Sequence, residues 1–172
     1  MEGEAMSGGV EIEISRKPMT IDEVSSVAEG SPVRLSGEVV ELILHSRRVL
    51  DEAIERGDAI YGATTGLGHA RNHQLSAGEM ELIQATYAEM HVGAMGGLLP
   101  VDRVRAAMVV RLNGFARGGS GISLPVAEAL AAFLNHGIHP LIPEHGSVGA
   151  GDLSQLAVLA RALIGRGQVE MA

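Results

Sequence analysis

A tyrosine stands in a glycine-rich segment of this 172-residue chain, in the run IYGATTGLG at residues 60–68. Glycines allow a backbone to approach a ligand more closely than larger residues do. Tyr61 could therefore act as a base on a bound molecule, provided that its surroundings favour the phenolate. A surface loop in which Tyr61 only fills space is the alternative interpretation, and composition alone favours it.

A histidine stands where an expected helix ends, immediately before the flexible run VGAMGG. The imidazole of His91 could bind a carboxylate or a polar ring, or transfer a proton near neutral pH. A helix-terminal histidine without a role is the alternative. His69 and His73 are four residues apart, but Ala70 occupies the place of the glutamate in the HExxH zinc motif, so we expect no metal site.

A third segment, GSVGAGDL at residues 146–153, is a glycine-rich turn that leads into an expected helix. The free N–H groups and the dipole at a helix start favour negative charge there. The segment lacks the Lys and Ser/Thr of a phosphate-binding P-loop. A plain turn capped by Asp152 is the alternative, although a need for close approach explains the glycines better.

The elements that must position these residues are mostly helices. Alternation at residues 10–15 predicts one short strand, and Ser/Thr residues followed three positions later by Glu predict helix starts at Thr20 and Ser76. A loop is expected at residues 57–78, and residues 1–9 are expected to be flexible. The expected helices cover residues 20–30, 36–57, 76–90, 100–112, 125–137 and 152–165.

Composition narrows the class of protein. Apolar residues make up 46% of the chain and aromatic ones only 2%, which predicts one domain of closely packed, mainly α structure. The net charge of -8 disfavours nucleic acid and anionic lipid as partners, and zero cysteines exclude disulfides and thiolate metal sites. We find no secretory signal and no apolar run long enough to span a bilayer, so a cytoplasmic location is expected.

Four segments, IYGATTGLG, MHVGA, RLNGFARGGSGI and LIPEHGSVGAGDLSQLA, together resemble the aromatic amino-acid ammonia-lyases and aminomutases in order and spacing. The resemblance extends over about residues 60–165. It implies the helical fold of the fumarase/aspartase superfamily, usually tetrameric, with active sites assembled from several subunits. The chain would be the N-terminal portion of such a protein, residues 1–172, without the central helical bundle and the C-terminal part.

The resemblance also implies a chemistry. Family members convert an Ala-Ser-Gly tripeptide into 4-methylidene-imidazol-5-one, an electrophile that captures an amino acid and eases loss of ammonia. Tyr61 matches the tyrosine that removes the β-proton. Met90 and His91 match the pair that selects the substrate, with Leu67 expected beside it, and a histidine at the second position favours histidine over tyrosine or phenylalanine.

One departure concerns the cofactor itself. Where the family has Gly-Ala-Ser-Gly-Asp, this chain has Gly149, Ala150, Gly151 and Asp152, so the serine that would donate the methylidene carbon is missing. Either a modified residue is left out of the sequence, which we favour because the flanking residues fit, or the deletion is natural. The chain as printed should not form the cofactor and is expected to be inactive alone.

Three functions stay open after the sequence analysis. The first is an ammonia-lyase, with histidine favoured as substrate. The second is a 2,3-aminomutase of the same family, which returns the ammonia to the β-carbon. The third is a non-catalytic relative that binds an amino acid or a partner subunit.

Overall fold

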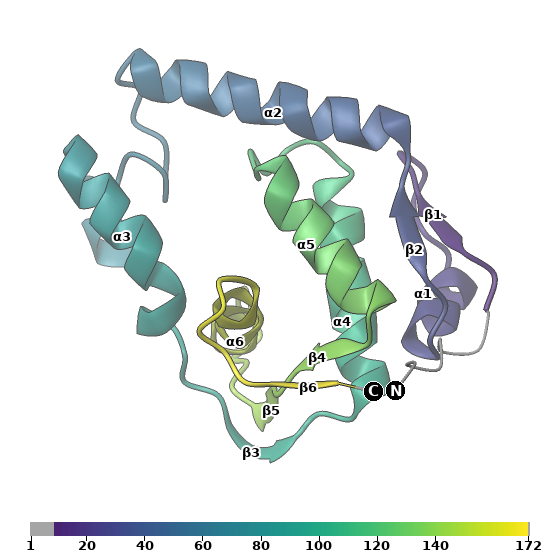
Figure 1. The fold of residues 1–172 in the computed structure, drawn as a ribbon. Helices are drawn as coiled ribbons and strands as arrows, with labels where there is room; N and C mark the ends of the chain where they lie inside the picture. Colours follow the sequence, from purple (N-terminus) through teal and green to yellow (C-terminus); the bar gives the residue numbers. More distant parts are fainter. Residues whose placement is uncertain (1–8, 172) are drawn as a thin grey trace.

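Helices dominate the structure, a computed structural model that describes residues 9–171 (Figure 1). The mainly α prediction is therefore confirmed, whereas the expected flexibility of residues 1–9 falls almost entirely outside the described residues. The helices are α1 (Ile21–Ala28), α2 (Gly37–Glu55), the short 3-10 helix η1 (Gly68–Ala70), α3 (Ala77–Met90), α4 (Val101–Phe115), α5 (Leu124–Asn135) and α6 (Leu153–Leu163).

The helices begin where the capping residues predict. Thr20 and Ser76 each accept a hydrogen bond from the backbone N–H three residues later, and Glu23 and Glu79 accept one back from the cap residue. The hydroxyl of Ser36 accepts from the N–H of Val39 at 3.3 Å and starts α2. Side-chain caps satisfy backbone donors that a helix leaves unpaired, so these three starts are encoded locally.

The strands are more numerous than predicted. β1 (Ile12–Ile14) is the expected strand, and it pairs in parallel with β2 (Val33–Leu35). Two further pairs are antiparallel, namely β3 (Met95–Leu98) with β5 (Pro143–His145) and β4 (Ile138–Pro140) with β6 (Val169–Met171). Strands of three or four residues carry too little alternation to be recognised, and their partners lie far away in sequence.

One helix start was also predicted wrongly. Pro100 lies at the N-cap position of α4 with an extended backbone, not inside the first helical turn. Proline suits both positions because its missing N–H is not needed at either. The helix begins one residue later than predicted, and the buried face of α4 is as predicted.

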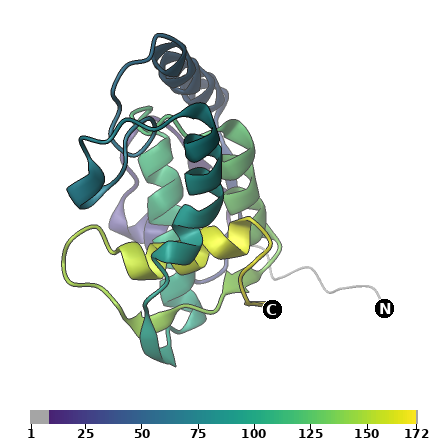
Figure 2. The ribbon, with the colours of Figure 1, turned by 90° about the vertical axis from the view of Figure 1, so that its left-hand side faces the viewer.

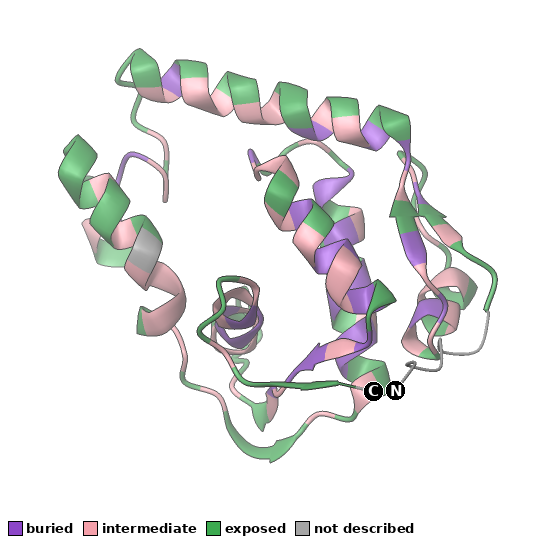
Figure 3. Ribbon diagram, viewed as in Figure 1, coloured by how far each residue is buried: buried purple, intermediate pink, exposed green. Residues whose placement is uncertain are grey.

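The core lies where α4 contacts α1 and α5 (Figure 3). Val104, Met108 and Leu112, which recur every four residues on α4, are at most 2% exposed, as their spacing predicts. Helix α3 differs, because none of its side chains that the structure describes is buried. Burial of apolar surface therefore fixes α4 and α5 firmly and α3 only weakly.

A buried arginine connects four segments of this core. Arg105, on α4, is 1% exposed. Its guanidinium donates to the carbonyl oxygens of Val27 at 2.8 Å, Leu134 at 2.8 Å and Ser31 at 3.2 Å. These carbonyls lie near the C-terminal ends of α1 and α5, where a positive charge is stabilised by the helix dipole. Burial lowers the pKa of Arg105, and the three carbonyls replace the water that the charge has lost.

His139, on β4, is the fourth group beside Arg105. It is fully buried, and its Nε2 lies 3.4 Å from Nη1 of the arginine. A guanidinium can only donate, so Nε2 of His139 accepts and the imidazole proton sits on Nδ1. Desolvation, and next the positive charge of Arg105, lower the pKa of His139, so this histidine is neutral in the folded chain.

This neutral histidine predicts a pH dependence of stability. The unfolded chain takes up a proton at His139 below its ordinary pKa of about 6.5, and the folded chain does so only at lower pH. The free energy of unfolding should therefore fall as the pH drops below about 6.5. Urea denaturation of the chain at a series of pH values will measure this slope.

The variant His139→Gln keeps a hydrogen-bond acceptor but cannot titrate, and its stability should fall less steeply over the same pH range. His139→Asn serves as a second variant if the longer amide does not fit. Equal slopes for the wild type and a folded variant would contradict the assignment of a neutral His139.

Candidate active site

Two buried threonines hold the loop that carries Tyr61. Thr64 and Thr65 are 3% and 5% exposed. The hydroxyl of Thr64 accepts from the N–H of Ile60 at 2.7 Å and donates to the carbonyl of Asp58 at 2.6 Å, while the backbone carbonyl of Thr64 accepts from the N–H of Leu75 at 2.8 Å. Hydrogen bonds thus join the two ends of the loop expected between α2 and α3, and Tyr61 lies on a defined turn.

The phenol of Tyr61 turns back over its own loop. The backbone N–H of Gly68 donates to the phenol oxygen at 3.1 Å, and the residue is 63% exposed. Gly62 has a φ of +74°, and a Cβ at this position would lie 3.0 Å from a methyl group of Leu67. The N–H of Gly68 therefore holds the phenol oxygen over the loop.

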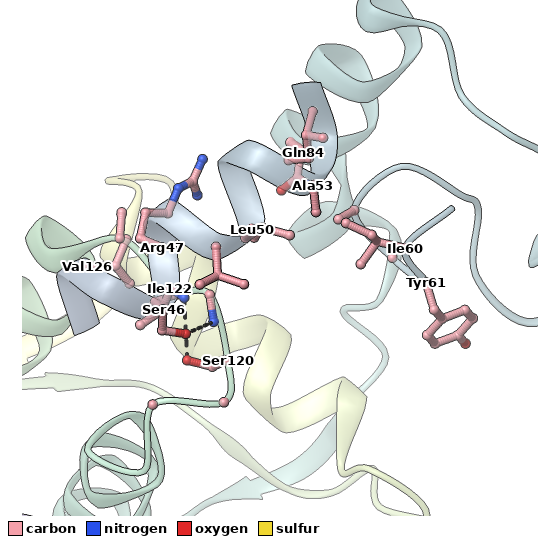
Figure 4. A pocket seen from close by; sticks show the side chains of 18 of the residues that line it. Ser46, Arg47, Leu50, Ala53, Ile60, Tyr61, Gln84, Ser120, Ile122 and Val126 are labelled. Atoms are coloured by element: carbon pink, nitrogen blue, oxygen red, sulfur yellow. Dashed lines mark hydrogen bonds between the residues drawn. The ribbon is translucent and has the colours of Figure 1, made fainter. Parts of the chain in front are cut away.

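A cavity of about 1070 Å³ opens beside this loop, between α2, the first turns of α3 and the segment that precedes α5. In Figure 4, Ile60 and Tyr61 lie at one end of it, and Ser46, Ser120 and Ile122 lie at the other. The Oγ of Ser46 accepts from the N–H of Gly121 at 3.1 Å and fixes the far wall. Neither His91 nor the turn before α6 lines this cavity.

His91 follows the last residue of α3, and its ring orientation is fixed. Nδ1 lies 2.8 Å from the carbonyl oxygen of Tyr87, which can only accept, so Nδ1 carries the proton. The ring of Tyr87 lies edge-on to the imidazole, with centroids 5.9 Å apart. Nε2 is then the acceptor of the neutral imidazole. The preceding residue, Met90, is 69% exposed.

The chain directly after His91 contacts both ends of the turn before α6. A Cβ at Gly93 would lie 3.5 Å from Oγ of Ser154, and a Cβ at Gly146 would lie 3.0 Å from Cα of Ala94 and 3.0 Å from Cβ of Ser154. A side chain at Gly146 would therefore force Ala94 or Ser154 to shift. The structure therefore brings the expected selectivity segment and the expected cofactor segment together.

The turn itself has an unusual backbone. Gly149 and Gly151 have φ values of +73° and +75°, and Asp152 follows with a φ of +46°. Left-handed backbone costs glycine little and aspartate more. Asp152 was predicted to cap α6, and this is wrong, because its side chain makes no capping bond; its carboxylate accepts a hydrogen bond from the hydroxyl of Ser147 instead.

The residues of this turn do not fit the cofactor that the resemblance implies. Ala150 and Gly151 carry no hydroxyl, and the hydroxyl of Ser147 is occupied by Asp152 and by the N–H of Gly149 at 3.0 Å. Ser147 is also followed by Val148 and not by a glycine, as the serine of an Ala-Ser-Gly tripeptide would be. The printed chain has no group here from which a methylidene carbon could come.

Several features of the site escaped the sequence analysis. Thr64 and Thr65 were read only as part of a loop, although two adjacent β-branched hydroxyl residues among glycines could have indicated a hydrogen-bonded turn. The pairing of β3 with β5, which carries residues 94–98 past residues 143–146, had no sequence signal. Within residues 9–171, no group of three potential metal ligands comes together, and no helix has the length and apolar character to cross a membrane.

Comparison with known proteins places the chain in a family. A family model described as "Aromatic amino acid lyase" matches residues 19–172. Histidine ammonia-lyase of Streptococcus pyogenes serotype M3 is 36% identical over 159 residues, which cover 91% of this chain and 31% of that protein. A probable histidine ammonia-lyase of Halobacterium salinarum is 36% identical over 159 residues, with 92% and 30% covered. The chain thus spans about a third of the length of these relatives.

Solved structures agree in fold. Tyrosine aminomutase from Streptomyces globisporus has a TM-score of 0.88 and 32% identity, covering 95% of this chain and 32% of its own. Ergothionase from Treponema denticola has a TM-score of 0.90 and 28% identity, with 94% and 34% covered. The helical, fumarase-like architecture is thereby confirmed, and the chain belongs to the aromatic amino acid lyase family, of which it forms an N-terminal portion.

Proposed function

We propose that this chain is the N-terminal portion of an ammonia-lyase that acts on an aromatic L-amino acid, with histidine as the favoured substrate. The observation that carries the proposal is the 36% identity with histidine ammonia-lyases over nine tenths of the chain. In the reaction the Cβ–H and Cα–N bonds break, a Cα=Cβ double bond forms, and ammonia leaves. Tyr61 takes the β-proton, and the N–H of Gly68 holds its oxygen in place.

His91 selects the substrate in this proposal. Because Nδ1 is committed to the carbonyl of Tyr87, the neutral ring offers Nε2 as an acceptor. A substrate ring with an N–H or O–H, such as imidazole or phenol, satisfies that acceptor, whereas a phenyl ring leaves it unpaired. An acceptor that a bound substrate covers and leaves unpaired costs binding energy, which favours histidine or tyrosine over phenylalanine.

The site needs more than this chain provides. The electrophile requires a serine between Ala150 and Gly151, and we propose that the complete native protein has one. Further binding groups come from the later part of the polypeptide and from other subunits of a homotetramer, in which Tyr61 and the turn before α6 meet around one substrate. The proposed enzyme works in the cytoplasm.

Two other functions are favoured by specific observations. Similarity to tyrosine aminomutase supports a 2,3-aminomutase, in which the released ammonia adds back to the β-carbon. The missing serine supports a non-catalytic relative that binds an amino acid or a partner subunit. Sequencing the DNA around residues 148–152 separates the third function from the first two, since a serine codon there removes its support.

The proposal predicts which amino acid the complete protein prefers as its substrate. The complete protein, incubated with histidine, tyrosine and phenylalanine, should release ammonia and form the unsaturated acid fastest from histidine, as followed by ultraviolet absorbance. Formation of a β-amino acid instead would identify the aminomutase. A folded, serine-containing protein that acts on none of the three would refute the lyase proposal.

Removing the proposed base should abolish most of the turnover. Tyr61→Phe keeps the ring but not the oxygen, and kcat with histidine should fall by about 10²- to 10⁴-fold, the usual contribution of a general base. The mass of the polypeptide should match that of the wild type apart from the substitution, because Tyr61 takes no part in building the electrophile. A kcat within twofold of the wild type would show that another group is the base.

A further inference from the structure

The C-terminal end of α3 carries His91 but has little apolar burial to hold it. No described side chain of α3 is buried, and Leu82 and Met90 are 64% and 69% exposed. The helix instead contacts α6, which runs crosswise to it (Figure 2). A discrete contact between the two helices therefore has more influence on the position of His91 than it would in a well-buried helix.

One ion pair joins these helices. Nε of Arg161, near the end of α6, lies 2.9 Å from a carboxylate oxygen of Glu89, the residue two before His91. The side chains are 32% and 35% exposed, so solvent screens this pair less than a fully exposed one. The guanidinium also donates to the carbonyl of Arg166 at 3.2 Å, which fixes its orientation at the end of α6.

The direction of the helix dipoles indicates that the carboxylate of Glu89 is stabilised by its pairing with Arg161 and not by its own helix, α3. A carboxylate in the last turn of a helix faces the negative end of the dipole, so Glu89 destabilises its own helix. Arg161 lies in the last turn of α6, where a cation is favoured. Among the described residues, the cost at Glu89 is offset by its contact with Arg161.

We infer that the Glu89–Arg161 pair is a positioning device for substrate selection. It fastens α3 to the end of α6, while the following chain is held near the start of α6 at Gly146, where an added Cβ would lie 3.0 Å from both Ala94 and Ser154. His91 lies between the two attachments, and its Nε2 is thereby held at a fixed place relative to the turn before α6. The inference deepens the proposed function and rests on it for the identity of the substrate.

Hydrogen–deuterium exchange tests the attachment without any turnover. In the complete protein, Glu89→Gln should speed exchange of the amides in residues 86–92 and leave those of α4 unchanged. Glu55→Gln is the matched control, because Glu55 also ends a helix, is exposed, and has no ion pair among the described residues. The double variant Glu89→Arg with Arg161→Glu should restore most of the protection.

Substrate discrimination tests the role in selection. For Glu89→Gln, the ratio of kcat/KM for histidine to that for phenylalanine should fall by about two- to fivefold, as expected for loss of a partly exposed ion pair. The charge-swapped variant should recover the ratio, and Glu55→Gln should keep it. A purely structural role would lower both kcat/KM values equally and leave the ratio unchanged.

The exchange and discrimination experiments distinguish failure of the positioning role from failure of the proposed function. Unchanged exchange at residues 86–92, or altered exchange with an unchanged substrate ratio, overturns the positioning role while the lyase remains. If the wild type turns over none of the amino acids, the proposed function fails, and the dissociation constants for histidine and phenylalanine replace kcat/KM in the ratio. A ratio that is equal in the wild type and Glu89→Gln then overturns the inference as well.

Discussion

Close packing between the chain after α3 and the two ends of the turn before α6 is the constraint on which the candidate site depends. Gly93 lies near the hydroxyl of Ser154, and Gly146 approaches Ala94 so closely that a Cβ at residue 146 would lie 3.0 Å from Cα of Ala94. Because His91 is two residues before Gly93, this packing sets how far the imidazole can be from the turn. Gly146 serves a close approach to the backbone of Ala94 here, and not flexibility.

The rest of the fold supplies a rigid base for that contact. Arg105 connects α4 to the ends of α1 and α5 and to β4, and β4 is followed closely by β5 and the turn. The arginine remains charged inside the core because carbonyl oxygens surround it. The turn is therefore attached to the best-buried part of the molecule. The loop that carries Tyr61 and the helix α3 are more exposed.

The sequence predicted the parts of the fold that are encoded locally. Hydroxyl residues three positions before Glu fixed the starts of α1 and α3, and the four-residue spacing of Val104, Met108 and Leu112 gave the buried face of α4. Pairing of short strands depends on contacts between distant residues and was missed. Asp152 was predicted as a cap from its type, but its backbone is left-handed and not extended, as an N-cap with a side-chain bond requires.

A designed disulfide tests the central contact most directly. These 172 residues contain no cysteine, so the double variant Gly93→Cys with Ser154→Cys introduces the only two thiols within them. A Cβ at residue 93 would lie 3.5 Å from Oγ of Ser154, which brings the two introduced side chains within reach of each other. After mild oxidation, mass spectrometry of a digest of the complete protein should show the peptides that contain residues 93 and 154 joined by a disulfide. Two freely reactive thiols in the folded protein would contradict the placement of His91 beside the turn.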